Sequence, residues 1–200
     1  MTVNKIRLCK EDRISKILDA AVEIIARDGF KQASTKEIAK LASCTEALVY
    51  KYFKTKEDIL DCITKTMFAY NDSEFLVHFD EKKDLKTVLI NLSSWYIDEY
   101  SANKNLYKVI YRHQCLNIEY NNYINNAVNE KRLKPIIEDC KKRQKNGEIK
   151  AGLDTTILGA LIREIIYSSR FKILFLDADP EIEKINYIKM ISLLVDSVKC

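Results

Sequence analysis

Glycine and proline almost never interrupt this chain, and that scarcity constrains its fold more than any other feature. Only 4 glycines and 2 prolines occur among 200 residues, while 47% of the residues are apolar. Sheet proteins need Gly and Pro in many turns, whereas helices exclude both residues from their interiors. Because Lys, Glu, Leu and Ile are also abundant, the composition predicts an all-α chain that can bury a sizeable core.

The spacing of apolar residues predicts the first helix. Gly29 supplies a left-handed stop at its end, and Phe30 can pack back on the last turn. One amphipathic stripe with three- and four-residue steps therefore predicts a helix over residues 11–28, formed by Ile14, Ile17, Leu18, Ala21, Ile24 and Ile25.

Capping residues predict two short helices and a long one after Gly29. Ser34 and Glu37 form a capping box that opens a helix ending near Ala42. Thr45 is a good N-cap for a second helix from Glu46 to about Phe53, and a further cap at Thr55 opens a long helix to about Phe75. Two short helices joined by a three-residue turn and braced by a third make a helix-turn-helix, whose second helix fits the major groove of DNA.

The rest of the chain keeps a helical pattern. Pro135 falls inside the third of the expected segments, where it predicts either a kink or a further boundary. The expected helices cover residues 83–101, 104–117, 120–145, 154–176 and 181–199. The sequence thus predicts a three-helix DNA-binding head over residues 1–54 and a larger helical body over residues 55–200.

A string of residues in fixed register across the head resembles the N-terminal domain of the TetR family. The resemblance covers about residues 10–62, and the rest of the chain shows no comparable motif. It implies a homodimeric transcriptional regulator with a divergent body that binds a small-molecule effector. The matching residues are Arg13, Ile17-Leu18, Ala20-Ala21, Gly29-Phe30, Ser34, Ile38-Ala39, and the run Leu48-Val49-Tyr50-Lys51-Tyr52-Phe53-Lys54-Thr55-Lys56-Glu57 with Ile59-Leu60.

The helix at 46–52 would be the recognition helix. We expect Ala47, Val49 and Phe53 to seat it on the bundle, while hydroxyl and ammonium groups face phosphates and guanine edges. The resemblance implies phosphate contacts by Tyr50 and Lys56. It also places Ser34 and Thr35 at the preceding helix start near the DNA, and it turns Thr45, Glu46, Leu48 and Lys51 toward bases or nearby backbone.

Two departures from the family pattern concern the base contacts. Ala47 stands where the family usually has Gly, and Cys44-Thr45 stands where it often has Val-Ser. Glu46 is acidic at a DNA-facing position, so it either selects cytosine amino groups or points away from the DNA. Tyr52 either contacts DNA or packs in the core of the head.

Most of the net positive charge lies in the first 60 residues. Residues 1–60 carry 12 Lys/Arg and 9 Asp/Glu, whereas the remaining 140 residues carry 21 and 20. Lys5, Arg7 and Lys10 lie in a segment without an acidic residue. This segment is either a solvated, disordered arm or an electrostatic contact with a polyanion.

Aromatic and polar side chains mark a candidate effector pocket in the body. Tyr and Trp supply apolar walls with polar handles, and charged groups on an otherwise apolar helix need a partner. Arg163 could meet an anionic ligand, pair internally or lie at a dimer rim, and the Tyr residues could belong to an ordinary core. The predicted pocket comprises Trp95, Tyr107, Tyr111, Arg163 and Tyr167.

Two apolar helices near the C-terminus predict a homodimer through an intermolecular four-helix bundle. The alternative is that both stripes close the core of the monomer. The first stripe comprises Ile157, Leu158, Leu161, Ile165, Ser168 and Phe175, and the second comprises Ile182, Ile185, Ile188, Ile191, Leu194 and Val198.

Several classes of function lack support in the sequence. We find no nucleophile elbow, phosphate-binding Gly loop or paired-carboxylate signature, so we predict that the chain is not an enzyme. The six cysteines form no C-x-x-C pair, and His78 and His113 lack partners at ligand spacing, so we expect no metal, cofactor or disulfide framework. No apolar run approaches a membrane span, and the N-terminus is too polar for a secretory signal, which predicts a cytoplasmic location.

The sequence therefore predicts a DNA-binding regulator, acting as a repressor that a small molecule releases from a double-stranded operator with an inverted repeat. The alternative is a helical ligand-binding protein whose head does not read DNA.

Overall fold

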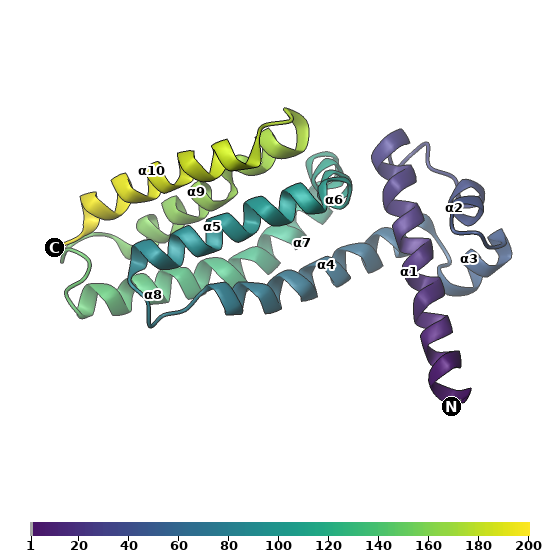
Figure 1. Cartoon of the computed structure of the whole chain (residues 1–200), viewed down its shortest axis with the longest axis horizontal. Coiled ribbons are helices and arrows are strands. Elements are labelled where there is room, and N and C mark those ends of the chain that lie inside the picture. The colour runs from purple at the N-terminus through teal and green to yellow at the C-terminus, as the bar shows by residue number, and fades with distance from the viewer. Residues whose placement is uncertain (1) are drawn as a thin grey trace. The chain divides into compact units, whose positions relative to one another are not determined.

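The computed structural model describes the backbone of residues 2–200 and the side chains of residues 12–200. Helices make up most of this part of the chain, which confirms the all-α prediction; its one isolated β-bridge joins Ile149 and Lys199. The elements, labelled in Figure 1, are α1 (Thr2–Asp28), α2 (Thr35–Leu41), α3 (Glu46–Tyr52), α4 (Lys56–His78), α5 (Leu85–Ala102), α6 (Lys104–Leu116), α7 (Ile118–Val128), the π turn η1 (Asn129–Leu133), α8 (Lys134–Lys145), α9 (Thr155–Phe175) and α10 (Pro180–Val198).

The described chain forms two compact units. The first comprises the residues up to Ala69 together with Asn105–Leu116, and the second comprises Tyr70–Lys104 and Asn117–Cys200. The long helix α4 begins in the first unit and ends in the second. The domain boundary that the sequence places between residues 54 and 55 stays a prediction.

The head in the first unit is built on α1, α2 and α3, and α2 packs against both of the others (Figure 1). Its centre is closed by side chains that are almost fully buried: Ile17, Ala21, Ile38, Val49 and Ile59. The predicted stripe of the first helix is thus confirmed at its centre, and the predicted helix-turn-helix is present.

The first helix is longer than the sequence predicts. It begins at Thr2, whereas the apolar stripe predicted a start near residue 11. Both alternatives for the first ten residues, a disordered arm and a contact with a polyanion, stay predictions. The side chains of Lys5, Arg7 and Lys10 lie outside the described residues.

The second unit is a helical bundle around α5. This helix packs against α9 and α10, and α9 in turn packs against α8 and η1. Figure 1 shows α5, α9 and α10 running side by side. Large, fully buried side chains fill the bundle, among them Phe75, Leu89, Leu92, Tyr96, Ile97, Ile162 and Tyr187.

Pro135 follows a π turn within a backbone that stays helical on both sides of that turn. The single helix predicted over residues 120–145 is divided into α7, the π turn Asn129–Leu133 and α8, with Pro135 in the first turn of α8. Proline has no N–H to donate and its ring crowds the carbonyl four residues earlier, here that of Lys131. Lys131 lies in the π turn, where carbonyls bond to N–H groups five residues later instead of four. Its carbonyl therefore needs no N–H from residue 135, and the wider turn leaves room for the proline ring.

Candidate DNA-binding surface and effector site

Local hydrogen bonds fix both helices of the helix-turn-helix. Ser34 Oγ accepts from the backbone N–H of Glu37 at 3.2 Å and donates to the Glu37 carboxylate at 2.9 Å. Thr45 Oγ1 accepts from the backbone N–H of Leu48 at 3.3 Å. Between the helices, Ser43 adopts φ 52° and so reverses the chain at the end of α2. The predicted caps at Ser34 and Thr45 are confirmed.

The recognition helix α3 is anchored by one face and leaves the other exposed. Val49 and Phe53 are buried, whereas Tyr50 is 50% exposed and Thr45 and Lys51 are also exposed. The prediction that Ala47 helps to seat the helix is wrong, since Ala47 is exposed. It lies two residues before Val49, about 200° around the helix axis, and therefore faces away from the core.

A chain of side-chain hydrogen bonds links the start of α2 to α3. Thr35 Oγ1 donates to Glu46 Oε1 at 2.5 Å and lies 3.0 Å from the hydroxyl of Tyr50. Thr35 and Glu46 are the first residues of their helices. The acidic group at the tip of α3 is therefore held within the head, a contact that the sequence alone did not predict.

Lys56 holds the turn that precedes α2. Its ammonium donates to the backbone carbonyls of Phe30, Lys31 and Ala33 at 2.8, 3.2 and 2.7 Å. These three bonds use all three N–H groups of a lysine ammonium. Its Nζ also lies 5.1 Å from the centre of the Phe30 ring. The phosphate contact expected of Lys56 stays a prediction, and in this structure the ammonium is bound by the head itself.

Helix α6 contributes a contact to the head within the first unit. Arg112 donates to the carbonyl of Ala26 at 2.9 Å, and the His113 ring meets Phe30 edge-on with centroids 5.2 Å apart. Burial lowers the pKa of His113, and the nearby carboxylate of Glu57 only partly opposes that shift. Phe30 is thus contacted by His113 from α6 and by Lys56 from the start of α4.

The predicted effector residues are distributed over both units. Tyr107 and Tyr111 lie on α6 in the first unit, whereas Trp95 lies on α5 and Arg163 and Tyr167 lie on α9 in the second. A single pocket formed by all five residues stays a prediction.

Aromatic contacts join Trp95 and Tyr167 through Tyr96, which is not among the five predicted pocket residues. Tyr96 is buried, and its hydroxyl lies 3.1 Å from that of Tyr167. The Tyr96 ring lies 4.3 Å from Trp95, which also stacks on His78 at 5.3 Å. Desolvation raises the pKa of Tyr96 well above its ordinary value, so this hydroxyl keeps its proton.

Arg163 has partners inside the unit. It donates to the side-chain oxygen of Asn129 at 3.0 Å and to the carboxylate of Glu164 at 2.6 Å. Of the three roles left open by the sequence, internal pairing is therefore the one with contacts in this structure.

Arg132 is a buried cation that interacts with Tyr96 and Tyr167, and it is not among the residues predicted from the sequence. Arg132 is only 4% exposed, and its guanidinium donates to the Asp72 carboxylate at 3.0 Å. Burial opposes the charge of Arg132, but its interactions with Tyr96, Tyr167 and the Asp72 carboxylate outweigh burial and raise its pKa. Arg132 stands in a run of charged residues and is buried within the π turn η1. No periodicity rule predicts such a turn.

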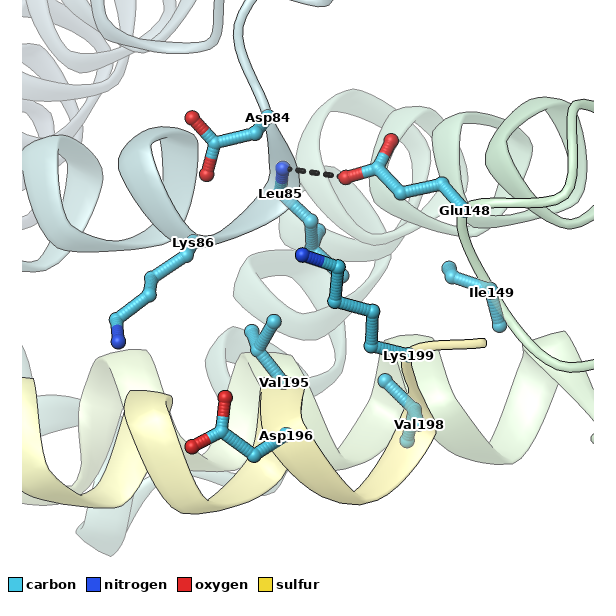
Figure 2. A pocket seen from close by; sticks show the side chains of 9 residues that line it. All are labelled: Asp84, Leu85, Lys86, Glu148, Ile149, Val195, Asp196, Val198 and Lys199. Carbon is cyan, nitrogen blue, oxygen red and sulfur yellow. Dashed lines mark hydrogen bonds between the residues drawn. The ribbon is translucent and has the colours of Figure 1, made fainter.

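A small cavity of about 180 Å³ lies in the second unit, between the start of α5 and the end of α10. Figure 2 shows Glu148 accepting from the backbone N–H of Leu85, a bond of 2.8 Å. Lysine and carboxylate side chains share the rim with aliphatic ones, and none of the predicted effector residues is among them. The lining consists of Asp84, Leu85, Lys86, Glu148, Ile149, Val195, Asp196, Val198 and Lys199.

The helices α9 and α10 each bury one side and expose a second apolar side. Leu158, Ile191 and Val198 of the predicted stripes are buried in the bundle. Closing the core of the monomer therefore accounts for only part of each stripe. The exposed apolar residues on these helices are Ile157, Leu161, Phe171, Ile182, Ile185, Ile188 and Leu193.

Among the described residues, no helix has the length and apolar content needed to cross a membrane. The side chains described in residues 12–200 include no group of three or more metal-binding residues placed to hold an ion. Five cysteines are described, all as free thiols, and burial raises the pKa of Cys140 to about 12.

Comparison with known proteins gives matches over both the head and the whole chain. The family model of the bacterial regulatory proteins of the tetR family matches residues 17–63. The fatty acid metabolism regulator protein of Bacillus subtilis (strain 168) is 30% identical over 155 residues, which cover 76% of this chain and 79% of the relative.

Solved structures match along nearly the full length. The transcriptional regulator FadR from Bacillus subtilis in complex with stearoyl-CoA has a TM-score of 0.75 and 26% identity, over 92% of this chain and 98% of that one. The fatty acid degradation regulator FadR from Bacillus halodurans has a TM-score of 0.70 and 22% identity, over 90% and 94% of the two chains, and shares the fold.

Proposed function

This chain belongs to the tetR family of bacterial regulatory proteins, and we propose that it acts within that family as a repressor that a small molecule releases from its operator. It is a DNA-binding transcriptional regulator, and its relatives are regulators rather than enzymes. The alternative of a ligand-binding protein whose head does not read DNA is not favoured, because the head keeps its helix caps, its buried anchor residues and an exposed recognition helix.

The observation that carries the proposal is the exposed face of α3. Lys51 is exposed and lies about 200° around the helix axis from the buried Val49, on the side that a recognition helix turns toward a major groove, and Thr45 and Tyr50 are exposed at the margins of that side. We assign the DNA-binding role to residues 1–54 and the effector-binding and dimerising role to residues 55–200. The DNA-contact set is that expected from the sequence: Ser34, Thr35, Thr45, Glu46, Leu48, Tyr50, Lys51 and Lys56.

The operator we propose is an inverted repeat bound by a homodimer in the cytoplasm. A two-fold dimer places its two recognition helices in successive major grooves about 34–36 Å apart. The exposed apolar sides of α9 and α10 are the surfaces that a partner copy would bury, because large contiguous apolar patches are uncommon on monomers.

The effector class we propose is a long-chain acyl-CoA. The support is the similarity to the Bacillus subtilis regulator solved with stearoyl-CoA. In this chain, Arg132 beside Tyr96 and Tyr167 gives the body an interior cation with phenolic neighbours, a combination suited to an anionic or carbonyl group of a ligand.

Selection of binding sites from fragmented bacterial DNA, followed by fluorescence anisotropy on the selected sequence, tests the function. We expect nanomolar binding to an inverted repeat, and release on addition of stearoyl-CoA but not of coenzyme A alone. Binding that shows no preference among fragments would contradict the proposed role as a sequence-specific regulator. Retention of the operator at saturating stearoyl-CoA would contradict the effector class alone.

A further inference from the structure

The proton count in the chain Thr35–Glu46–Tyr50 fixes the direction of its hydrogen bonds. Thr35 has a single hydroxyl proton, and an ionised carboxylate can only accept, so that proton goes to Glu46 at 2.5 Å. The 3.0 Å contact between Thr35 Oγ1 and Tyr50 is then a bond that the phenol donates. While this chain is intact the Tyr50 proton is used within the head, so the phosphate contact proposed for Tyr50 requires its bond to Thr35 to break, and one oxygen of Glu46 is fixed by the start of α2.

The second carboxylate oxygen of Glu46 is left for an outside donor. Glu46 is the first residue of the recognition helix, and Oε2 has no hydrogen-bond partner among the described residues. The N-terminal residues of a recognition helix are those that reach base edges in the major groove. The positive end of α3 also favours a negative group at this position.

Base chemistry limits what such an acceptor can read. The major groove presents acceptors on guanine and thymine, an amino donor beside an acceptor on adenine, and an amino donor on cytosine. A fixed carboxylate oxygen is repelled by the acceptors of guanine and thymine, and partly by the acceptor of adenine. Cytosine is the base whose edge offers it a donor without an adjacent acceptor on the same ring.

We propose that Glu46 reads the exocyclic amino group of a cytosine in each half-site, and that Thr35 and Tyr50 are positioning residues that aim its carboxylate. The proposal rests on the proposed function and adds the identity of one recognised base. It also gives an acidic side chain a role at a surface that binds a polyanion, since its free oxygen would accept from a base instead of facing a phosphate.

The test uses the full-length dimer and the inverted repeat selected above, with each base varied in turn in both half-sites. We expect the parent to prefer cytosine at one position by roughly tenfold. Replacing that cytosine with N4-methylcytosine, which puts a methyl group where the groove-facing hydrogen was, should cost a similar factor. This arm uses the unaltered protein and therefore does not depend on how a variant folds.

Variants separate positioning from simple support of the fold. Glu46→Gln should shift the preference toward adenine, which a carboxamide recognises with two hydrogen bonds. Thr35→Val, which keeps the shape and removes the hydroxyl, should reduce the cytosine preference several-fold, whereas Thr35→Ser should keep it.

The proposal is overturned if N4-methylcytosine binds like cytosine, or if Glu46→Gln keeps the parent's base preference. It is also overturned for Thr35 if Thr35→Val weakens every sequence equally. If the parent itself prefers no inverted repeat, the proposed function fails instead, so the two failures are distinguishable.

Discussion

Lys56 shows how one residue can satisfy a family pattern and yet have a role that the pattern does not state. The sequence places it at the start of a helix near DNA phosphates, which stays a prediction. The structure gives its ammonium three carbonyl partners in the turn before α2. Periodicity and capping rules could not predict this, because the partners lie 23 to 26 residues away in sequence.

We expect Lys56→Ala to destabilise the head by about 1–3 kcal/mol, since hydrogen bonds to a charged group are worth more than neutral ones. Thermal unfolding followed by circular dichroism measures this loss. Lys51→Ala is the matched control, because Lys51 is exposed and should leave the melting temperature unchanged. Equal melting temperatures for the parent, Lys56→Ala and Lys51→Ala would contradict a stabilising role for the three Lys56 hydrogen bonds.

The salt dependence of operator binding tests the other role of Lys56. Each phosphate contact contributes about 0.9 to the slope of log affinity against log salt concentration. A slope that falls by this amount in Lys56→Ala would support the phosphate contact predicted from the sequence. An unchanged slope would leave the hydrogen bonds to the turn before α2 as the only role of this side chain.

His113 makes the stability of the first unit depend on pH. Burial lowers its pKa in the folded protein, so the unfolded chain binds the proton more readily. The stability contributed by neutral His113 is present above its unfolded pKa of about 6.5 and is lost as pH falls through the folded pKa. We expect the melting temperature to drop between pH 7.5 and pH 5, and to drop less in His113→Phe, which keeps an aromatic edge against Phe30. An equal drop in both proteins would show that other groups cause it.

At the scale of the elements, the sequence predicted which helices exist better than which of their sides are buried. The helices of the head and most of those in the body are found close to their predicted positions. The π turn was missed because a Pro inside a helical pattern is compatible with a kink or a boundary. The stripes on α9 and α10 were wide, and a wide stripe does not say which part faces the monomer's own core.

The exposed sides of α9 and α10 give a prediction about assembly. Ile185 is 53% exposed on α10, and we expect Ile185→Glu to shift the dimer toward monomer by burying a charge at the interface. Analytical ultracentrifugation at micromolar concentration measures the shift. Leu76→Glu on α4 is the control, because Leu76 is an exposed apolar residue outside these two helices. A parent that sediments as a monomer would contradict the dimer itself.

At the scale of the whole molecule, fold and function class were predictable from a register of residues confined to the head. The effector residues were not, since a pocket depends on which distant helices meet, and single-residue chemistry cannot fix that. Arg132 illustrates the limit: no sequence pattern singled it out, yet it is a buried cation in the π turn η1. The predicted Trp95 and Tyr167 lie near it in the cluster through Tyr96.

Helix α4 is the element through which effector and operator would be coupled. It starts in the first unit, ends in the second, and has neither Gly nor Pro from Lys56 to His78. A helix without such residues resists bending, so a shift at one end is carried to the other. We therefore expect stearoyl-CoA to lower operator affinity by about 5- to 150-fold, the range of typical couplings between sites.

Thermodynamic linkage makes this coupling reciprocal, so the operator must lower the affinity for stearoyl-CoA by the same factor. Calorimetric titration of stearoyl-CoA with and without the operator measures that factor, and anisotropy measures its counterpart. The double variant Thr66→Gly with Ala69→Gly, at two exposed positions of α4, should bind each partner and show a smaller factor, because glycine loosens the helix. Thr66→Ala should keep the parent's factor. Equal affinities for stearoyl-CoA in the two titrations of the parent would show that effector and DNA bind independently, whatever the strength of either.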